Sequence, residues 1–221
     1  MAEKNMSELL AYLEETLTAW EAPVIKKGLK LPGLRDDQPL RALLEKHFGE
    51  VIIPPALLEL YRWTAGTNPG GDLCPESGKI NRLESIDEML TRNKEYDDMQ
   101  DEEDKRMGYA YSYQGLGVAP FSWWVTDPMA IDVKTGAGVI YMLGGIVYQA
   151  GYDRPYVQIF DSLEGMFRAI CACYEQEIFY VDVEDELEIE DGVEMNKICA
   201  KYNEFSEYWD PWRAGAGGKR T

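Results

Sequence analysis

The side chains able to take part in bond-making chemistry are few in this chain. His47 is the single histidine, so a Ser-His-Asp or Cys-His catalytic site would have to include it. It stands directly before Phe48 and Gly49, at the end of a segment whose leucines have helical spacing, which favours a structural or surface role. We therefore expect no catalytic residues and no enzymatic activity.

The four cysteines lack the spacing of a metal-binding group. Cys171 and Cys173 are separated by one residue and would face different sides of a helix, whereas zinc sites use pairs two to four positions apart and a second pair. We interpret both as small buried hydrophobic residues and expect no metal and no cofactor. With Cys74 and Cys199 they form no disulfide framework, and the first residues lack the apolar core of a signal peptide, so we expect a reduced, cytoplasmic protein.

Glycines and carboxylates also fall short of known ion-binding patterns. No Lys-Ser or Lys-Thr follows Gly136-x-Gly138 or Gly144-Gly145, as a phosphate-binding loop requires, so we interpret both as hairpin turns. One acidic run lacks the alternating oxygen ligands, central glycine and terminal glutamate of a calcium loop. We expect that run to form a solvated surface; it contains Asp97, Asp98, Asp101, Glu102 and Glu103.

The overall charge restricts the class of partner. The chain of 221 residues has 22 basic and 40 acidic side chains, a net charge of −18. Such a surface repels the phosphates of nucleic acids and of anionic membranes, and it attracts a basic protein. No run approaches the ~20 apolar residues that span a bilayer. We expect a protein partner, and neither nucleic acid nor membrane.

Aromatic residues add a second feature of a protein-binding surface. Trp123 and Trp124 are adjacent, so they would point to opposite sides of a strand, and exposed Trp and Tyr are favoured anchors at interfaces. Core packing is the competing interpretation. The candidate partner-binding residues are carboxylates and aromatics: Asp72, Asp97, Asp98, Asp101, Glu102, Glu103, Tyr111, Trp123 and Trp124. Of these, Asp72 falls in a Pro- and Gly-rich stretch, Thr67–Lys79, that predicts a long surface loop.

Both helices and strands must position these residues. Apolar spacings of three and four predict helices at residues 6–20, 38–48, 54–66, 160–177 and 193–208, and another that runs from Leu83 into the acidic run. Short β-branched and aromatic runs predict an antiparallel meander with strands at 117–121, 129–133, 137–143 and 146–149. The sequence therefore predicts an α+β fold with a central, mostly antiparallel sheet flanked by helices.

The same blocks carry a family resemblance. Residues Pro54-x-x-Leu57-x-x-x-Tyr61 run into Gly66, Pro120-Phe121 and Ile131-Asp132 follow, and Gly138-Val139 and Ser162 with Phe167 complete the series. This series resembles the SUKH superfamily, known for bacterial immunity proteins that neutralise toxins and for fungal cell-wall regulators. The resemblance implies a single SUKH-like domain over residues 1–212 with an N-terminal helical extension. Residues 213–221 have nothing to bury and are expected to be a disordered tail.

Two functions follow as hypotheses. The first is a non-enzymatic immunity protein whose acidic surface docks on a basic toxin, for instance a nuclease, delivered by a polymorphic or contact-dependent toxin system. The second is an intracellular regulatory or scaffold module of the same family that binds an endogenous protein. A small-molecule enzyme ranks third, because no carboxylate or tyrosine constellation identifies one.

Overall fold

Helices and strands follow one another in mixed order, which confirms the α+β prediction. The computed structural model describes residues 4–19, 32–66, 73, 83–99, 118–124, 127–143, 156–182 and 187–213. The helices are α1 (Met6–Ala19), α3 (Gln38–Phe48), α4 (Pro55–Trp63), α5 (Ile86–Met99), α9 (Leu163–Glu175), α10 (Gly192–Tyr202) and the 3₁₀ helix η2 (Glu207–Trp212). The strands are β1 (Val118–Trp124), β2 (Asp127–Asp132), β3 (Ile140–Leu143), β4 (Tyr156–Phe160), β5 (Phe179–Val181) and β6 (Leu187–Ile189).

The strands form two separate sheets in the described part of the chain. Strands β1 to β4 are neighbours in chain order and all pair antiparallel, so they form a meander. Strands β5 and β6 pair as a hairpin of their own, which the sequence analysis did not predict. The first three predicted strands overlap β1, β2 and β3. The fourth, residues 146–149, lies outside the described residues. Strand β4 was not predicted, and the helix predicted from Phe160 includes only its last residue.

The turn between β2 and β3 is built by one carboxylate and two glycines. Asp132 Oδ1 accepts hydrogen bonds from the backbone N–H groups of Lys134 (2.8 Å) and Thr135 (3.0 Å). Gly136 and Gly138 follow with φ of 73° and 67°, a region that L side chains rarely adopt. This confirms the hairpin interpretation of that glycine pair, whereas Gly144-Gly145 lies outside the described residues.

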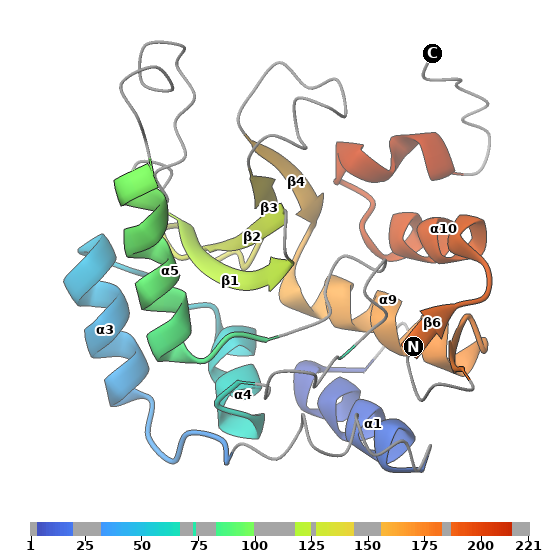
Figure 1. Cartoon of the computed structure of the whole chain (residues 1–221), viewed down its shortest axis with the longest axis horizontal. Coiled ribbons are helices and arrows are strands. Elements are labelled where there is room, and N and C mark those ends of the chain that lie inside the picture. The colour runs from blue at the N-terminus through green and yellow to red at the C-terminus, as the bar shows by residue number, and fades with distance from the viewer. Residues whose placement is uncertain are drawn as a thin grey trace.

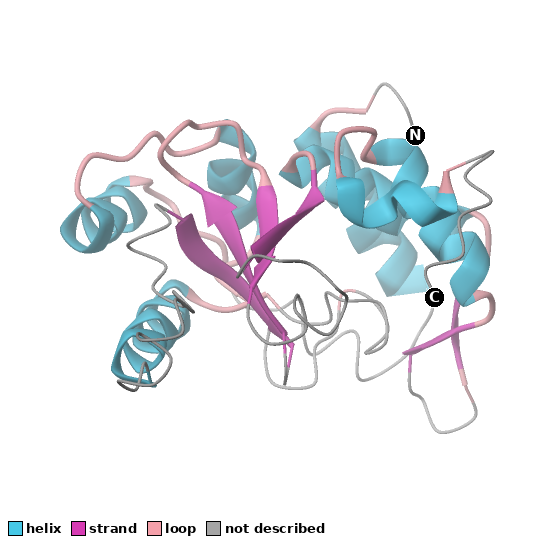
Figure 2. Cartoon of the chain, turned by 90° about the horizontal axis from the view of Figure 1, so that it is seen from above, coloured by secondary structure: helices cyan, strands magenta, loops and turns pink. Residues whose placement is uncertain are grey.

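Helices lie on both sides of the four-stranded sheet. Helices α3 and α5 lie on one side of it, where both contact β1. Helices α1, α9 and α10 lie together on the other side, and the β5–β6 hairpin lies at the far end of that group (Figures 1 and 2). The hairpin is thus held by helices rather than by the main sheet.

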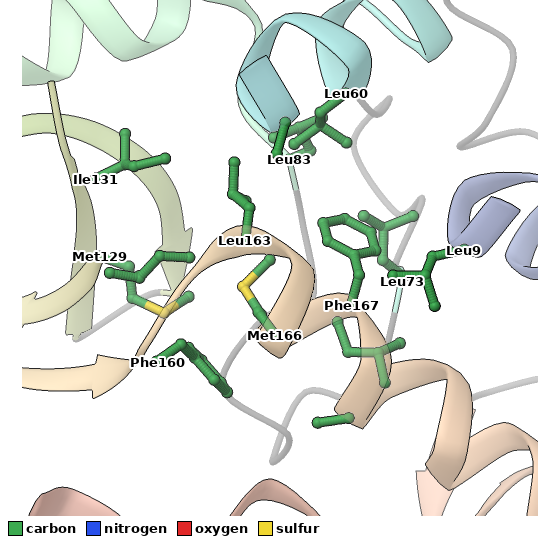
Figure 3. Packing of buried hydrophobic residues seen from close by; sticks show 14 of the residues in the cluster. Leu9, Leu60, Leu73, Leu83, Met129, Ile131, Phe160, Leu163, Met166 and Phe167 are labelled. Carbon is green, nitrogen blue, oxygen red and sulfur yellow. The ribbon is translucent and has the colours of Figure 1, made fainter. Parts of the chain in front are cut away.

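Helix α9 is the centre of the hydrophobic core. Apolar residues at intervals of three and four are typical of a helix with one buried face, but ten of the 13 residues of α9 are buried. Figure 3 shows the reason: Leu163 points toward Leu83, Met166 lies on the side of the sheet residues Met129 and Phe160, and Phe167 points toward Leu9 of α1. Truncating a fully buried aromatic such as Phe167 to alanine costs about 3–5 kcal/mol of unfolding free energy. Small residues, Gly165 and Ala172 among them, complete the buried surface where other elements approach α9 closely.

Helix α4 starts with proline as predicted but ends earlier than predicted. Pro54 is its N-cap and Pro55 its first residue, while its last residue is Trp63 rather than one near Gly66. Thr64 is extended and forms an isolated β-bridge with Pro32, which stops the helix. Gly66 instead has a positive φ of 127° and lies against Ser85, where a Cβ atom would be 2.7 Å from the Ser85 nitrogen. Position 66 therefore requires glycine because the Ser85 backbone lies so close, and not because a helix ends there.

The C-terminal segment is fastened to the junction of β4 and α9. The Asp161 N–H donates to Asn203 Oδ1 (3.0 Å), and Asp161 Oδ2 accepts from the Phe205 N–H (2.9 Å). Further along, Ser206 Oγ donates to the Gln158 carbonyl (2.8 Å). Arg213, assigned to the tail in the sequence analysis, donates to the carbonyls of Asn203 and Ser206. Residues 214–221 lie outside the described residues.

Gly165 provides a test of this fastening. A Cβ at position 165 would lie 2.7 Å from Asn203 Oδ1 and 3.0 Å from the Tyr202 carbonyl oxygen. We expect Gly165→Ala to lower the free energy of unfolding by about 1–3 kcal/mol, because the C-terminal segment must move away from α9. The measurement is urea unfolding followed by circular dichroism.

Gly192→Ala is the matched control, since it makes the same change at a helical glycine whose added Cβ would meet nothing within 4 Å. We expect its stability to equal or exceed that of the original protein, because alanine restricts the unfolded chain more than glycine does. Equal stability of the two variants would show that the contact between α9 and Asn203 is not tight.

Candidate protein-binding surface

The structure describes little of the predicted partner-binding residues. Asp97 and Asp98 fall in the last turn of α5. Trp123 and Trp124 end β1, opposite Pro128 and Asp127. The structure describes the backbone of these four candidates but not their side chains. The remaining candidates lie outside the described residues: Asp72, Asp101, Glu102, Glu103 and Tyr111. Their part in binding stays a prediction.

The residues considered for catalysis are placed more fully. Cys171 and Cys173 are buried at 0% and 1% exposure, which confirms the packing interpretation. The Cys171 thiol donates to the Leu9 carbonyl, and burial raises the pKa of Cys171 to about 12. His47 is half-buried near the end of α3.

Among the described residues, no three His, Cys, Asp or Glu side chains are grouped to hold a metal ion. Within the same residues, no helix is long and apolar enough to cross a bilayer.

The residues that carry the family resemblance are mostly inside the fold. Leu57, Tyr61, Ile131 and Phe167 are at most 1% exposed. The Tyr61 hydroxyl donates to the Glu84 carbonyl (3.0 Å), and burial raises the pKa of Tyr61 well above its ordinary value, with the nearby carboxylates of Glu84 and Glu88 adding to the rise. These residues hold the scaffold together, so a binding surface has to be sought elsewhere.

A depression on the surface lies between α1, the end of α9 and the β5–β6 hairpin. We call it the acidic depression; its volume is about 1140 Å³. Buried Tyr174 and Phe179 form part of its apolar lining, with their rings edge-to-face at 5.1 Å between centroids. The Tyr174 hydroxyl donates to the Leu73 carbonyl (2.9 Å), which fixes the ring in place. A rigid aromatic wall of this kind suits recognition of another molecule.

Four carboxylates surround that aromatic wall. They come from three elements that are distant in sequence: Glu15 from α1, Glu175 and Glu177 from the end of α9, and Glu190 next to β6. All four side chains are exposed, and none of the described lining residues is basic. The depression therefore has a negative potential around an apolar interior, which favours a positively charged group with an apolar stem.

Two features position this rim. After α9, Glu177 adopts a left-handed backbone with φ of 56°, and the Ile178 N–H donates to the Cys173 carbonyl (2.9 Å), so the chain turns sharply into β5. The Glu190 N–H then donates to the Ile178 carbonyl (2.9 Å) and ties the end of β6 to the same turn. Carboxylates 13 positions apart are thereby held on one surface.

Tyr12 shows how a cation can bind at this surface. The Lys4 ammonium lies 4.3 Å from the centroid of the Tyr12 ring, within the range of a cation–π contact. Burial raises the pKa of Tyr12, the carboxylate of Glu175 adds to the rise, and a hydrogen bond with Thr16 opposes it. One edge of the acidic depression therefore already holds a positively charged side chain of the protein itself.

The sequence contained a signal for this region. Residues 175–213 contain 13 acidic and three basic side chains, a net charge of −10, which is more than half of the total charge. Most of the acidic candidates predicted from the sequence lie in the earlier acidic run, and none of them is Glu175, Glu177 or Glu190. The sequence does not show that Glu15 and Tyr12 of α1 lie beside these residues.

No protein-family model matches this sequence, and a search of curated proteins finds no match.

The buried thiols give a prediction for alkaline pH. The pKa of Cys171 is raised in the folded protein, so between about pH 9 and about pH 12 the unfolded chain loses this proton while the folded one retains it. Stability from this thiol is thus complete below pH 9 and falls as the pH rises, by about 1.4 kcal/mol per pH unit. Urea unfolding at several pH values above 9 measures the slope.

Cys171→Ala is the comparison that isolates this thiol. We expect its stability to fall less steeply with pH than that of the original protein, by the contribution of one group. Identical slopes for the two proteins would mean that the Cys171 thiol ionises as readily in the folded protein as in the unfolded chain.

Proposed function

We propose that this protein is a non-enzymatic binding protein whose acidic surface docks on a basic protein partner. The observation that carries the proposal is the acidic depression, where four exposed carboxylates surround an apolar, aromatic interior and no described lining residue is basic. A lysine or arginine of the partner would place its charge among the carboxylates and its stem against the aromatic rings. This extends the expectation from the net charge of −18 to a defined place on the molecule.

The family resemblance supports one form of this function. We propose a SUKH-like immunity protein that neutralises a cognate toxin by direct binding, with the main sheet and α9 as the rigid scaffold. If the toxin is a nuclease, carboxylates of this protein would occupy the ground that substrate phosphates normally hold. Complementary charge then raises the association rate more than it raises affinity, and salt weakens the effect.

Co-expression tests the proposed function in cells. The protein is produced together with a candidate toxin domain encoded by a neighbouring gene, chosen because production of that domain alone arrests growth. We expect growth to be restored and a stable complex to be recovered at low salt. Continued growth arrest without a complex would overturn the immunity proposal.

Neutralising two rim carboxylates tests the role of the acidic depression. We expect Glu15→Gln with Glu175→Gln to slow association with that domain about threefold to tenfold, because two charges that attract the partner are removed. The dissociation rate should change less, and the dependence of association on salt should become shallower. Stopped-flow fluorescence at low and high salt measures these rates.

The control removes the same charge elsewhere. Glu45 and Glu50 are exposed at the end of α3, on the opposite side of the main sheet from the depression (Figure 1). We expect Glu45→Gln with Glu50→Gln to leave the association rate nearly unchanged. Equal slowing by both pairs would mean that net charge alone acts, without a defined docking place.

A further inference from the structure

A second depression lies next to the acidic one, on the other side of Glu190. We call it the apolar groove; it lies between β6, the start of α10 and η2, and its volume is about 600 Å³. Its apolar lining includes buried Met195 and Trp209, half-buried Ile189 and Tyr208, and exposed Val193 and Trp212. Glu190 lines both depressions, so the two form one continuous surface.

The groove exposes two large apolar side chains at its edge. Val193 is 51% exposed and Trp212 is 36% exposed. A Cβ added at Gly192 would meet nothing within 4 Å, so there is open space above the start of α10. Large exposed hydrophobic residues that line a concavity are typical of an interaction site.

The walls of the groove are fixed rather than adaptable. The Trp209 indole N–H donates to the Ile159 carbonyl of β4, and its ring meets Tyr208 edge-to-face at 4.7 Å between centroids. Asp191 caps α10 by accepting from the N–H groups of Val193 and Glu194, both at 2.9 Å. A site held in this way loses little conformational freedom when it binds.

Charge decides what can occupy the groove. Its described lining residues include the carboxylates of Glu190 and Asp191 and no basic side chain. A second copy of this chain would bring the same negative surface, with a net charge of −10 over residues 175–213, against itself. A segment that combines a bulky apolar side chain with flanking lysine or arginine matches both the apolar walls and the acidic rim.

We propose that the apolar groove binds a large apolar side chain of a basic peptide segment, whose neighbouring cationic residues lie over Glu190 and in the acidic depression. The inference rests on the proposed function, since it names the chemistry of the docking partner. Contacts in the groove supply the part of the affinity that salt does not weaken, because burial of apolar surface is not screened.

Two synthetic peptides of equal charge test this proposal directly. One is fluorescein-labelled Arg-Arg-Leu-Trp-Arg-Arg and the other is Arg-Arg-Gly-Ser-Arg-Arg with the same label. We expect the first to bind about tenfold or more tightly, as burial of a large apolar side chain predicts, and the ratio to persist at high salt. Fluorescence polarisation gives the affinities, and backbone amide shifts by NMR should locate binding at residues 189–196 and 208–212.

Surface variants supply the controls. Val193→Gln with Trp212→Gln should abolish the difference between the peptides, while Ile52→Gln, at a residue 57% exposed outside the groove, should preserve it. Equal affinity of the two peptides, binding of neither, or shifts outside the groove would overturn the proposal. So would a dimer of the unliganded protein, detected by light scattering, that Val193→Gln with Trp212→Gln dissociates. The peptide assay uses no toxin. Peptide binding in the groove can therefore be established or refuted whatever the outcome of the growth assay.

Discussion

Burial of α9 on nearly all sides is the constraint on which the rest of this structure depends. The helix packs against the main sheet, α1 and α10 together, and its small residues set how closely these elements approach. Its start is fixed where Ser162 Oγ accepts from the Gly165 N–H (3.0 Å) and where Asp161 is joined to Asn203. Its end turns through Glu177 into the β5–β6 hairpin. The surface that we assign to binding is therefore built at the end of a helix that is buried on nearly all sides.

That arrangement separates the residues that hold the fold from those that meet a partner. Leu57, Tyr61 and Phe167 are buried and set the shape of the scaffold. The carboxylates at the end of α9 and along the hairpin stay in water, because like charges repel and their desolvation would be costly. Such a division allows the surface to vary while the core is retained. It also means that a resemblance carried by core residues describes the scaffold better than it describes the partner.

The sequence predicted the elements that depend on local pattern. Leucines at helical spacing identified α1 and α3, and Gly49 with a φ of 75° ends α3 as expected. The apolar spacing alone did not reveal that α9 is buried on nearly all sides. The predicted burial of Cys171 and Cys173 on different sides of the helix was the one sign of it. The sequence pattern also missed β5 and β6, each three residues long within a densely acidic stretch. The two strands pair with each other, and the Ile178 N–H before β5 donates to the Cys173 carbonyl of α9, a contact that the local pattern does not show.

The site was harder to predict than the fold for a related reason. Charge counts along the sequence identify acidic runs but not which of them lies beside an aromatic wall. Tyr12 and Glu15 come within reach of Glu175 and Glu190 only because α1 packs on α9. A surface assembled from segments more than 150 positions apart has no continuous motif. Its chemistry becomes visible when the packing of the helices is known.

Hydrogen–deuterium exchange of this chain, free and bound to a toxin domain that it neutralises in the growth assay, measures directly where the partner docks. We expect binding to slow exchange in residues 175–182 and 187–196 and to leave α3 unchanged. Protection confined to the acidic run around Asp97 to Glu103, with residues 175–196 unaffected, would contradict it.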